Sequence, residues 1–165
     1  MKYLRKWLLK TECISPSRSW GDVKFYPKSV LVSGYFDGLH NGHLDYLEQA
    51  KGYGDFIYCI VANDEQLMRK KGRIFATAKE RGHLVDVVLK GLRIPHVVYT
   101  PFYHTTNDTV ADAIRFFRPQ VFFRGYDKTL ETMPEDERKV CDELGIEIVH
   151  AKNRIGERHS SEVFK

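Results

Sequence analysis

The sequence predicts an α/β fold: a Rossmann-like, doubly wound parallel sheet of five strands with helices on both faces. Two observations support this fold class. From residue 29 onward, short apolar runs alternate with segments whose apolar residues recur at helical spacing. Glycine or proline lies at several of the boundaries. The 165 residues suffice for one domain with a core, and we expect that domain over 29–165, behind an N-terminal arm over 1–28.

Five short runs rich in β-branched and aromatic residues are the expected strands. Ser29–Ser33 (SVLVS) and Phe56–Ala62 (FIYCIVA) are almost continuously apolar, as buried strands are. His96–Tyr99 is a shorter run of the same kind, and Gln120–Arg124 (QVFFR) follows a proline. Ile146–His150 (IEIVH) is the fifth strand.

Four segments between these runs are the expected helices. His43–Lys51 has apolar residues at helical spacing, and Thr77–Lys90 is expected to turn Leu84, Val87 and Val88 inward. Thr109–Phe117 is stopped by the Arg-Pro pair that follows it. Pro134–Leu144 begins at a proline and is followed by a glycine, which is typical of helix ends.

The composition is that of a globular protein with a mild basic excess. Apolar residues make up 42% of the chain and charged residues 29%, which argues against disorder. The formal net charge of +4 is smaller than the dense clusters of nucleic-acid-binding proteins, so we expect no nucleic-acid partner. Since one phosphate pocket needs only a few cations, the charge suits an anionic small molecule.

The three cysteines, Cys13, Cys59 and Cys141, are far apart and odd in number. Without a CxxC pair they support neither a zinc ribbon nor a disulfide framework, and they fit a reducing cytoplasm. The basic segment 1–10 lacks the apolar centre and cleavage site of a signal peptide. No apolar run approaches the length of a membrane span. We therefore expect a cytoplasmic protein without a membrane partner.

The segment Gly34–His43, GYFDGLHNGH, lies between the first expected strand and the first expected helix. In doubly wound sheets, ligands bind at the carboxyl ends of the strands. A glycine at position 34 lets the backbone approach a ligand, and a helix N-terminus offers N–H groups to phosphate. His40 and His43 are three residues apart, so they can face the same way and donate hydrogen bonds to phosphate oxygens. Two histidines alone could equally be structural or bind a metal, but no third ligand lies at a recognisable metal-binding spacing.

This loop resembles the G-x-F-D-x-x-H-x-G-H signature of the cytidylyltransferase branch of the HxGH nucleotidyltransferase superfamily. The superfamily includes glycerol-3-phosphate, choline-phosphate and ethanolamine-phosphate cytidylyltransferases, as well as heptose-phosphate and phosphopantetheine adenylyltransferases. The resemblance implies a nucleotidyltransferase domain over 29–165 in which His40 and His43 are catalytic. It also implies that other residues of the loop bind the nucleotide, namely Gly34, Tyr35, Phe36, Asp37 and Gly42.

The resemblance continues through the basic segment that follows the second expected strand. Lys70 matches by position a family lysine that contacts triphosphate and acceptor phosphates, which implies a catalytic role for it. Lys71 or Arg73 could bind phosphate in the same way, and the whole run could equally be a solvated surface loop. Arg81 resembles a family arginine that faces the active site, although a helix-surface arginine fits nearly as well.

Two segments nearer the end of the chain complete the resemblance. The stretch from Pro119 to Asp127 is similar to the family's Pro-Asp-x-x-x-x-Gly-x-Asp, whose loop lies beside the nucleotide base. Gly125 and Asp127 are therefore candidates for base or ribose contacts, although Asp127 could instead cap a turn. The family's R-T-x-G-x-S-T-T signature is matched only loosely, because its arginine does not align without a one-residue slip. Its candidate phosphate-binding residues here are Arg154 or Arg158 with Ser160 and Ser161.

The resemblance implies direct in-line attack by an acceptor phosphate on the α-phosphorus of CTP or ATP, with release of pyrophosphate. The protein then supplies positioning and charge stabilisation, and magnesium bridges phosphate oxygens with few protein ligands. A homodimer is expected by family analogy. Base and acceptor stay open, with cytosine preferred. The alternatives are an ATP-dependent adenylyltransferase acting on a heptose-type sugar phosphate, a non-catalytic nucleotide-binding regulatory module, and an RNA-binding protein, which the short chain and modest charge argue against.

Overall fold

The computed structural model describes residues 11–13, 28–101 and 108–153. Its strands are β1 (Thr11–Cys13), β2 (Ser29–Gly34), β3 (Phe56–Val61), β4 (His96–Pro101), β5 (Val121–Arg124) and β6 (Glu147–His150). Its helices are α2 (Asn41–Ala50), the 3₁₀ turn η2 (Lys51–Tyr53), α3 (Asp64–Lys71), α4 (Ala78–Gly91), α5 (Ala111–Phe117) and α6 (Glu135–Leu144).

The sheet has the order β1-β4-β3-β2-β5-β6. Strands β2 to β6 pair in parallel, which confirms the five-stranded parallel sheet, and every described crossover between them contains a helix. β1 adds a short antiparallel edge strand to β4, and it comes from the segment expected to form the N-terminal arm. Because the chain passes from β2 to β3 on one side and reaches β5 on the other, the strand order reverses between β2 and β5.

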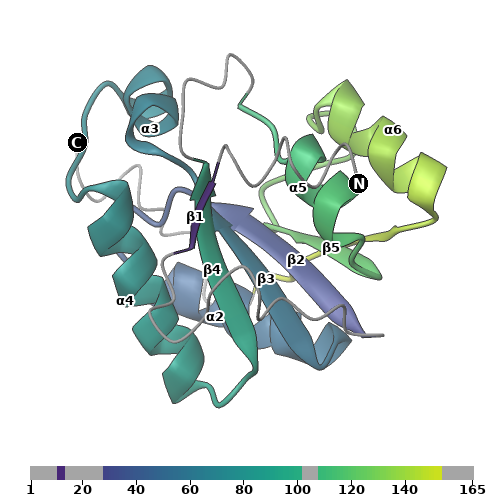
Figure 1. The fold of residues 1–165 in the computed structure, drawn as a ribbon, viewed down its shortest axis with the longest axis horizontal. Helices are drawn as coiled ribbons and strands as arrows, with labels where there is room; N and C mark the ends of the chain where they lie inside the picture. The colour runs from purple at the N-terminus through teal and green to yellow at the C-terminus, as the bar shows by residue number, and fades with distance from the viewer. Residues whose placement is uncertain (1–10, 14–27, 102–107, 154–165) are drawn as a thin grey trace.

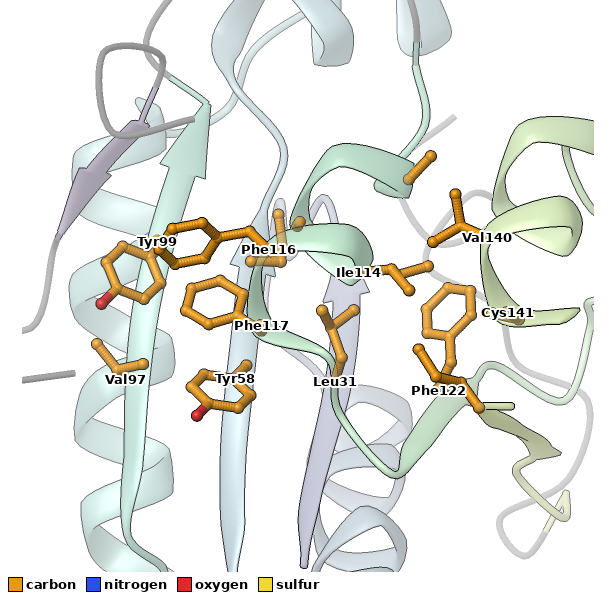
Figure 2. Packing of buried hydrophobic residues seen from close by; sticks show 14 of the residues in the cluster. Leu31, Tyr58, Val97, Tyr99, Ile114, Phe116, Phe117, Phe122, Val140 and Cys141 are labelled. Carbon is orange, nitrogen blue, oxygen red and sulfur yellow. The ribbon is translucent and has the colours of Figure 1, made fainter. Parts of the chain in front are cut away.

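Helices cover both faces of the sheet, as expected (Figure 1). On one face α5 and α6 pack against β2 to β6, and Figure 2 shows Ile114 and Phe117 of α5 above Leu31 and Tyr58 of the sheet. On the other face α2 and α4 contribute a second buried cluster, of which Leu47 is a fully buried member. The parallel strands β2 to β5 are buried on both faces, which explains their almost continuous apolar sequences.

Several helix ends lie where local sequence chemistry places them. Capping boxes begin α3 at Asn63 and α4 at Thr77, each with a glutamine or glutamate three residues on. Glycines in the left-handed conformation end α3 at Gly72 (φ 69°) and α6 at Gly145 (φ 65°). α6 follows Pro134, which confirms the predicted helix between that proline and Gly145.

The helices differ from the expected ones in two ways. α3 was not among the expected helices, but its capping box and its basic last turn, which suits the helix dipole, support eight helical residues. In α4, Leu84 and Val87 are exposed instead of inward. The inward positions are held by Arg81 and Asp86 together with Val85 and other small or apolar residues. Two buried charged residues therefore shift the apparent apolar face of the helix.

A buried carboxylate joins α4 to the start of β4. Asp86 has no exposed surface, and its carboxylate contacts Nε2 of His96 at 3.0 Å and the ammonium group of Lys90. The other ring nitrogen of His96, Nδ1, lies 2.7 Å from the carbonyl oxygen of Ile94. This cluster lies at the amino end of β4 and fixes α4 on the sheet.

Replacing Asp86 with alanine is expected to destabilise the fold by about 3 kcal/mol, because it leaves the buried imidazole of His96 without its carboxylate. Lys90→Ala removes only the half-exposed partner and is expected to cost less than about 1 kcal/mol. Urea unfolding of both variants measures the difference. Equal losses in the two variants would contradict this account of the cluster.

Candidate functional site

The loop from Tyr35 to His40 joins β2 to α2 at the carboxyl end of the central strand. Phe36 adopts a positive φ of 52°, which is unusual for an aromatic residue, and its ring is buried. A Cβ on Gly34 would lie 3.0 Å from that ring, so a side chain at position 34 would press on Phe36. The ring of Phe36 in turn lies 5.2 Å from the imidazole of His43, between ring centroids. Gly34 therefore leaves room for the ring of Phe36, and that ring packs beside His43.

His40 begins α2 as its N-cap. Its Nδ1 accepts a hydrogen bond of 3.0 Å from the backbone N–H of Gly42, so the proton of the neutral ring is assigned to Nε2. A Cβ on Gly42 would lie 2.7 Å from Cε1 and 2.9 Å from Nδ1 of this ring. The glycine of the HxGH motif thus makes room for the imidazole that caps the helix.

His43 lies in the first turn of α2, beside His40. The centroids of the two rings are 4.0 Å apart. Nδ1 of His43 is buried and has no hydrogen-bond partner in the described ranges. Burial lowers the pKa of His43, the nearby His40 and the positive charge of Lys71 act in the same direction, and together they bring it to about 3. The ring is therefore neutral in the unliganded protein at neutral pH.

Arg81 connects three segments around this loop. Its guanidinium group has no exposed surface, and it donates to the carbonyl oxygen of Tyr35, to that of Ala76 at 2.9 Å and to a carboxylate oxygen of Asp64 at 2.8 Å. Asp64 is the first residue of α3, and the same oxygen also accepts the N–H of Ala78 at 2.7 Å. Arg81 therefore supports the loop from within, and its predicted contact with a nucleotide stays a prediction.

Asp37 fixes the same region from the loop side. Its buried carboxylate accepts the backbone N–H groups of Phe75 and Ala76, at 3.2 and 3.1 Å. The segment from α3 to α4 is thus tied to the β2–α2 loop by Asp37 and by Arg81. Asp37 therefore has a structural role in the loop, and its binding of a nucleotide stays a prediction.

The basic residues lie on this tied segment. Lys70 and Lys71 end α3, Arg73 follows Gly72, and all three are exposed. Figure 1 shows α3 beyond the carboxyl ends of the strands. The positive charge of Lys71 is close enough to contribute to the lowered pKa of His43. An ion pair of 2.7 Å between Arg69 and Asp108 also holds α3. Burial, and then the negative charge of Asp108, raise the pKa of Tyr35.

Gly125 and Asp127 form an exposed turn after β5. The N–H of Lys128 donates to the carbonyl of Gly125 at 3.1 Å, and the ammonium group of Lys128 pairs with Asp127 at 3.2 Å. A Cβ on Gly125 would lie 2.7 Å from Oδ1 of Asp127. Both the turn and the end of the central strand lie at the carboxyl edge of the sheet, so the structure places the two predicted residues on the same edge as the histidine loop.

The remaining predicted residues, Arg154, Arg158, Ser160 and Ser161, lie outside the described residues. Within the described ranges, no group of three or more histidine, cysteine or acidic side chains could hold a metal ion. None of the helices in the described part has both the length and the apolar character needed to cross a membrane.

Three residues at this edge are absent from the sequence-based prediction. Asp64 binds Arg81, and Arg124, at the end of β5, is buried and donates to the carbonyl of Thr129 at 2.8 Å. His150 ends β6 opposite Arg124, and burial and that guanidinium group lower its pKa. Only their position in the sequence could have indicated these three residues, since each lies at or just after the carboxyl end of a strand.

The neutral state of His43 is expected to make the fold sensitive to acid. Its folded-state pKa of about 3 lies below the ordinary value of 6.5, so the unfolded chain binds the proton first and stability falls as pH drops below 6.5. Replacing His43 with glutamine is expected to remove up to about 1.4 kcal/mol of this loss for each pH unit. Urea unfolding at pH 7.5, 6 and 5 measures the free energy of unfolding of both proteins. If it falls equally with pH in wild type and variant, the buried neutral state of His43 is refuted.

Gly42→Ala is expected to lower stability by about 1 kcal/mol, because the added methyl group displaces the His40 cap. Gly52→Ala is the matched control, since a Cβ there meets nothing within 4 Å and is expected to be neutral or mildly stabilising. Thermal unfolding compares the two. A Gly42→Ala variant as stable as the control would show that the cap tolerates a side chain.

The chain is similar to known proteins over most of its length. The cytidylyltransferase-like family model matches residues 31–163, which include the histidine loop, the basic segment and the turn after β5. The FAD synthase of Pyrococcus horikoshii is 31% identical over 122 residues, 72% of this chain and 75% of the relative. The FAD synthase of Thermococcus kodakarensis is 34% identical over 113 residues, 67% of this chain and 71% of the relative.

Other relatives match only part of their own length. The bifunctional protein HldE of a Marinomonas species is 32% identical over 108 residues, which are 64% of this chain but 21% of that protein. The match to the FAD synthase of Natrialba magadii spans 37% of that protein, at 44% identity over 55 residues.

A solved structure agrees with the fold. The lipopolysaccharide core biosynthesis protein from Thermoplasma volcanium superposes with a TM-score of 0.56 and 27% identity, over 75% of this chain and 95% of that one. The family match extends over most of the chain and includes both histidines of the loop. The chain therefore belongs to the cytidylyltransferase-like family, and it is a nucleotidyltransferase with a Rossmann-like fold.

Proposed function

We propose that this protein transfers the nucleoside monophosphate of ATP to a phosphate monoester and releases pyrophosphate. An oxygen of the acceptor phosphate attacks the α-phosphorus, and the bond from that phosphorus to the oxygen of the β-phosphate breaks. The observation that carries the proposal is the pair of imidazoles of His40 and His43 at the start of α2, of which burial keeps that of His43 neutral. No general base is needed, since a phosphate monoester is already ionised near neutral pH.

His40 is suited to bind phosphate oxygen as a fixed donor. Its Nδ1 is engaged by Gly42, so its proton lies on Nε2 and its ring orientation is set by the cap. The N-terminus of α2 adds the positive end of a helix dipole. A donor that is already oriented stabilises developing charge without a cost of reorganisation during the reaction.

His43 is suited to respond to charge. In the unliganded protein, burial and the neighbouring positive charge keep its ring neutral. A polyphosphate beside the ring would favour the protonated form, because an opposite charge within a few ångströms raises the pKa of a histidine. The hydrogen bond to the α-phosphate then becomes charge-assisted as negative charge develops in the transition state.

Cations complete the site in this proposal. Lys70, Lys71 and Arg73 neutralise acceptor and triphosphate charge, and the effect of Lys71 at His43 supports a role for the end of α3. The carboxylate of Asp37, in the loop, accepts backbone N–H groups, and that of Asp64 accepts a backbone N–H group and the guanidinium group of Arg81. A magnesium ion held largely by phosphate oxygens and water, with few protein ligands, fits this donor set, and it would offset phosphate charge.

The relatives' names support the choice of donor and acceptor. The sequence resemblance left CTP and ATP open with cytosine preferred, whereas relatives named FAD synthase align over most of both chains. FAD consists of FMN joined to AMP, so FMN, a phosphate monoester, is the first acceptor to test and ATP the first donor. A sugar phosphate of the heptose type is the second acceptor, which the similarity to HldE supports. The homodimer stays a prediction, which sedimentation velocity tests.

A panel of ATP and CTP against FMN, heptose 1-phosphate and glycerol 3-phosphate, followed by pyrophosphate release, tests the proposal. The expected result is turnover with ATP and FMN above every other pair. His43→Ala is expected to lower kcat at least about a hundredfold while circular dichroism shows an intact fold. Wild-type turnover in that variant would refute the role of the histidine pair. Binding of nucleotide without turnover of any acceptor would favour a regulatory module.

A further inference from the structure

One buried hydroxyl group bridges the two strands between which the sheet reverses its order. Tyr46 lies on α2, and its hydroxyl donates a hydrogen bond of 2.7 Å to the carbonyl oxygen of Phe123 on β5. The hydroxyl oxygen of Tyr46 also accepts a hydrogen bond of 3.4 Å from the backbone N–H of Ser33 on β2. Burial raises the pKa of this phenol, so the group is a neutral donor under all ordinary conditions.

The hydroxyl lies where the pairing of β2 with β5 stops. Their ladder runs from Val30 opposite Val121 to Val32 opposite Phe123. Beyond it β2 continues to pair with β3 as far as Gly34. The N–H of Ser33 on β2 and the carbonyl group of Phe123 on β5 thus bond to the hydroxyl of Tyr46. An unpaired buried backbone group costs about as much as a lost hydrogen bond, so the Tyr46 hydroxyl satisfies both strands where they diverge.

Tyr46 is one helical turn from His43. Residues three apart on a helix are neighbours on the same side, so a constraint on Tyr46 acts on the position and rotation of the first turn of α2. The ring of Tyr46 also stacks on that of Phe123, with centroids 5.5 Å apart and planes inclined by 28°. The helix that carries both histidines is therefore anchored to β5 by a stack and to both strands by one oxygen atom.

We propose that Tyr46 is a positioning residue, whose hydroxyl holds the start of α2 at the depth and rotation that direct His43 toward the reacting phosphates. The expected effect on kcat rests on the proposed function, whereas the expected effect on the position of α2 does not. Misplacing a catalytic group by about 1 Å can cost on the order of a hundredfold in rate. A single oxygen atom that sets the helix position is therefore expected to affect kcat more than substrate binding.

Tyr46→Phe is the direct test, because it removes the oxygen and keeps the stacked ring. Tyr53→Phe is the matched control: Tyr53 also packs on Phe123, with centroids 5.1 Å apart, but it is 43% exposed. We expect Tyr46→Phe to lower kcat at least about tenfold with little change in the KM for ATP. Tyr53→Phe is expected to leave both parameters unchanged. Both are measured well below the melting temperature of each variant.

A second measurement does not need turnover. Proton-decoupled NMR of ring-labelled histidine follows the protonation of His43 between pH 7.5 and pH 5. In the wild type and in Tyr53→Phe the ring is expected to stay neutral over this range. In Tyr46→Phe it is expected to begin to titrate, because a displaced helix turn readmits water to the ring.

The outcomes separate the two proposals. If no nucleotide is turned over by the wild type, the proposed function fails, and the NMR comparison alone decides the role of Tyr46. If Tyr46→Phe lowers the melting temperature but keeps the wild-type kcat and the wild-type titration of His43, the hydroxyl is only structural and the positioning role is wrong. A lower kcat together with an earlier titration of His43, in Tyr46→Phe and not in Tyr53→Phe, supports it.

Discussion

The burial of one guanidinium group organises the end of the sheet at which the site lies. Removing a charged group from water costs several kcal/mol unless its donors are satisfied. Arg81 has no exposed surface, so its three acceptors must stay in place for as long as the chain is folded. They belong to the histidine loop, to the segment before α4 and to the start of α3. The loop and the helix that carries the lysines are consequently held in one arrangement.

Around this support, the proposed site would separate two tasks that phosphate chemistry imposes. Neutral donors lie at the start of α2, packed on Phe36 and partly shielded from water, where the direction of a hydrogen bond matters. Full positive charges lie at the exposed end of α3, where flexible ammonium groups can follow a moving phosphate. Nearby carboxylates are directed at backbone N–H groups and at Arg81, so they repel an incoming polyphosphate less than unpaired acids would.

The fold was predictable from the sequence, and so was the place of the histidine loop within it, because both depend on local patterns. Apolar runs indicated the five parallel strands, and GYFDGLHNGH indicated the loop after the central one. The inward face of α4 was not predictable in the same way. Arg81 and Asp86 occupy core-facing positions, and only contacts with residues distant in sequence make such burial possible. The hydrogen-bond partners of Asp37 were not predictable for the same reason, since its carboxylate accepts from residues 75 and 76, which are distant in sequence.

The use of imidazole to start α2 has an electrostatic consequence of its own. Aspartate or serine would satisfy the N–H of Gly42 equally well, and aspartate would add a favourable interaction with the helix dipole. It would also place an anion beside the site where another anion must arrive. The imidazole of His40 accepts at one nitrogen and carries its hydrogen on the other, so initiation of the helix and the proposed recognition of an anion depend on a single tautomer. A second proton on that ring would abolish the cap, which couples the integrity of the first helical turn to acidity.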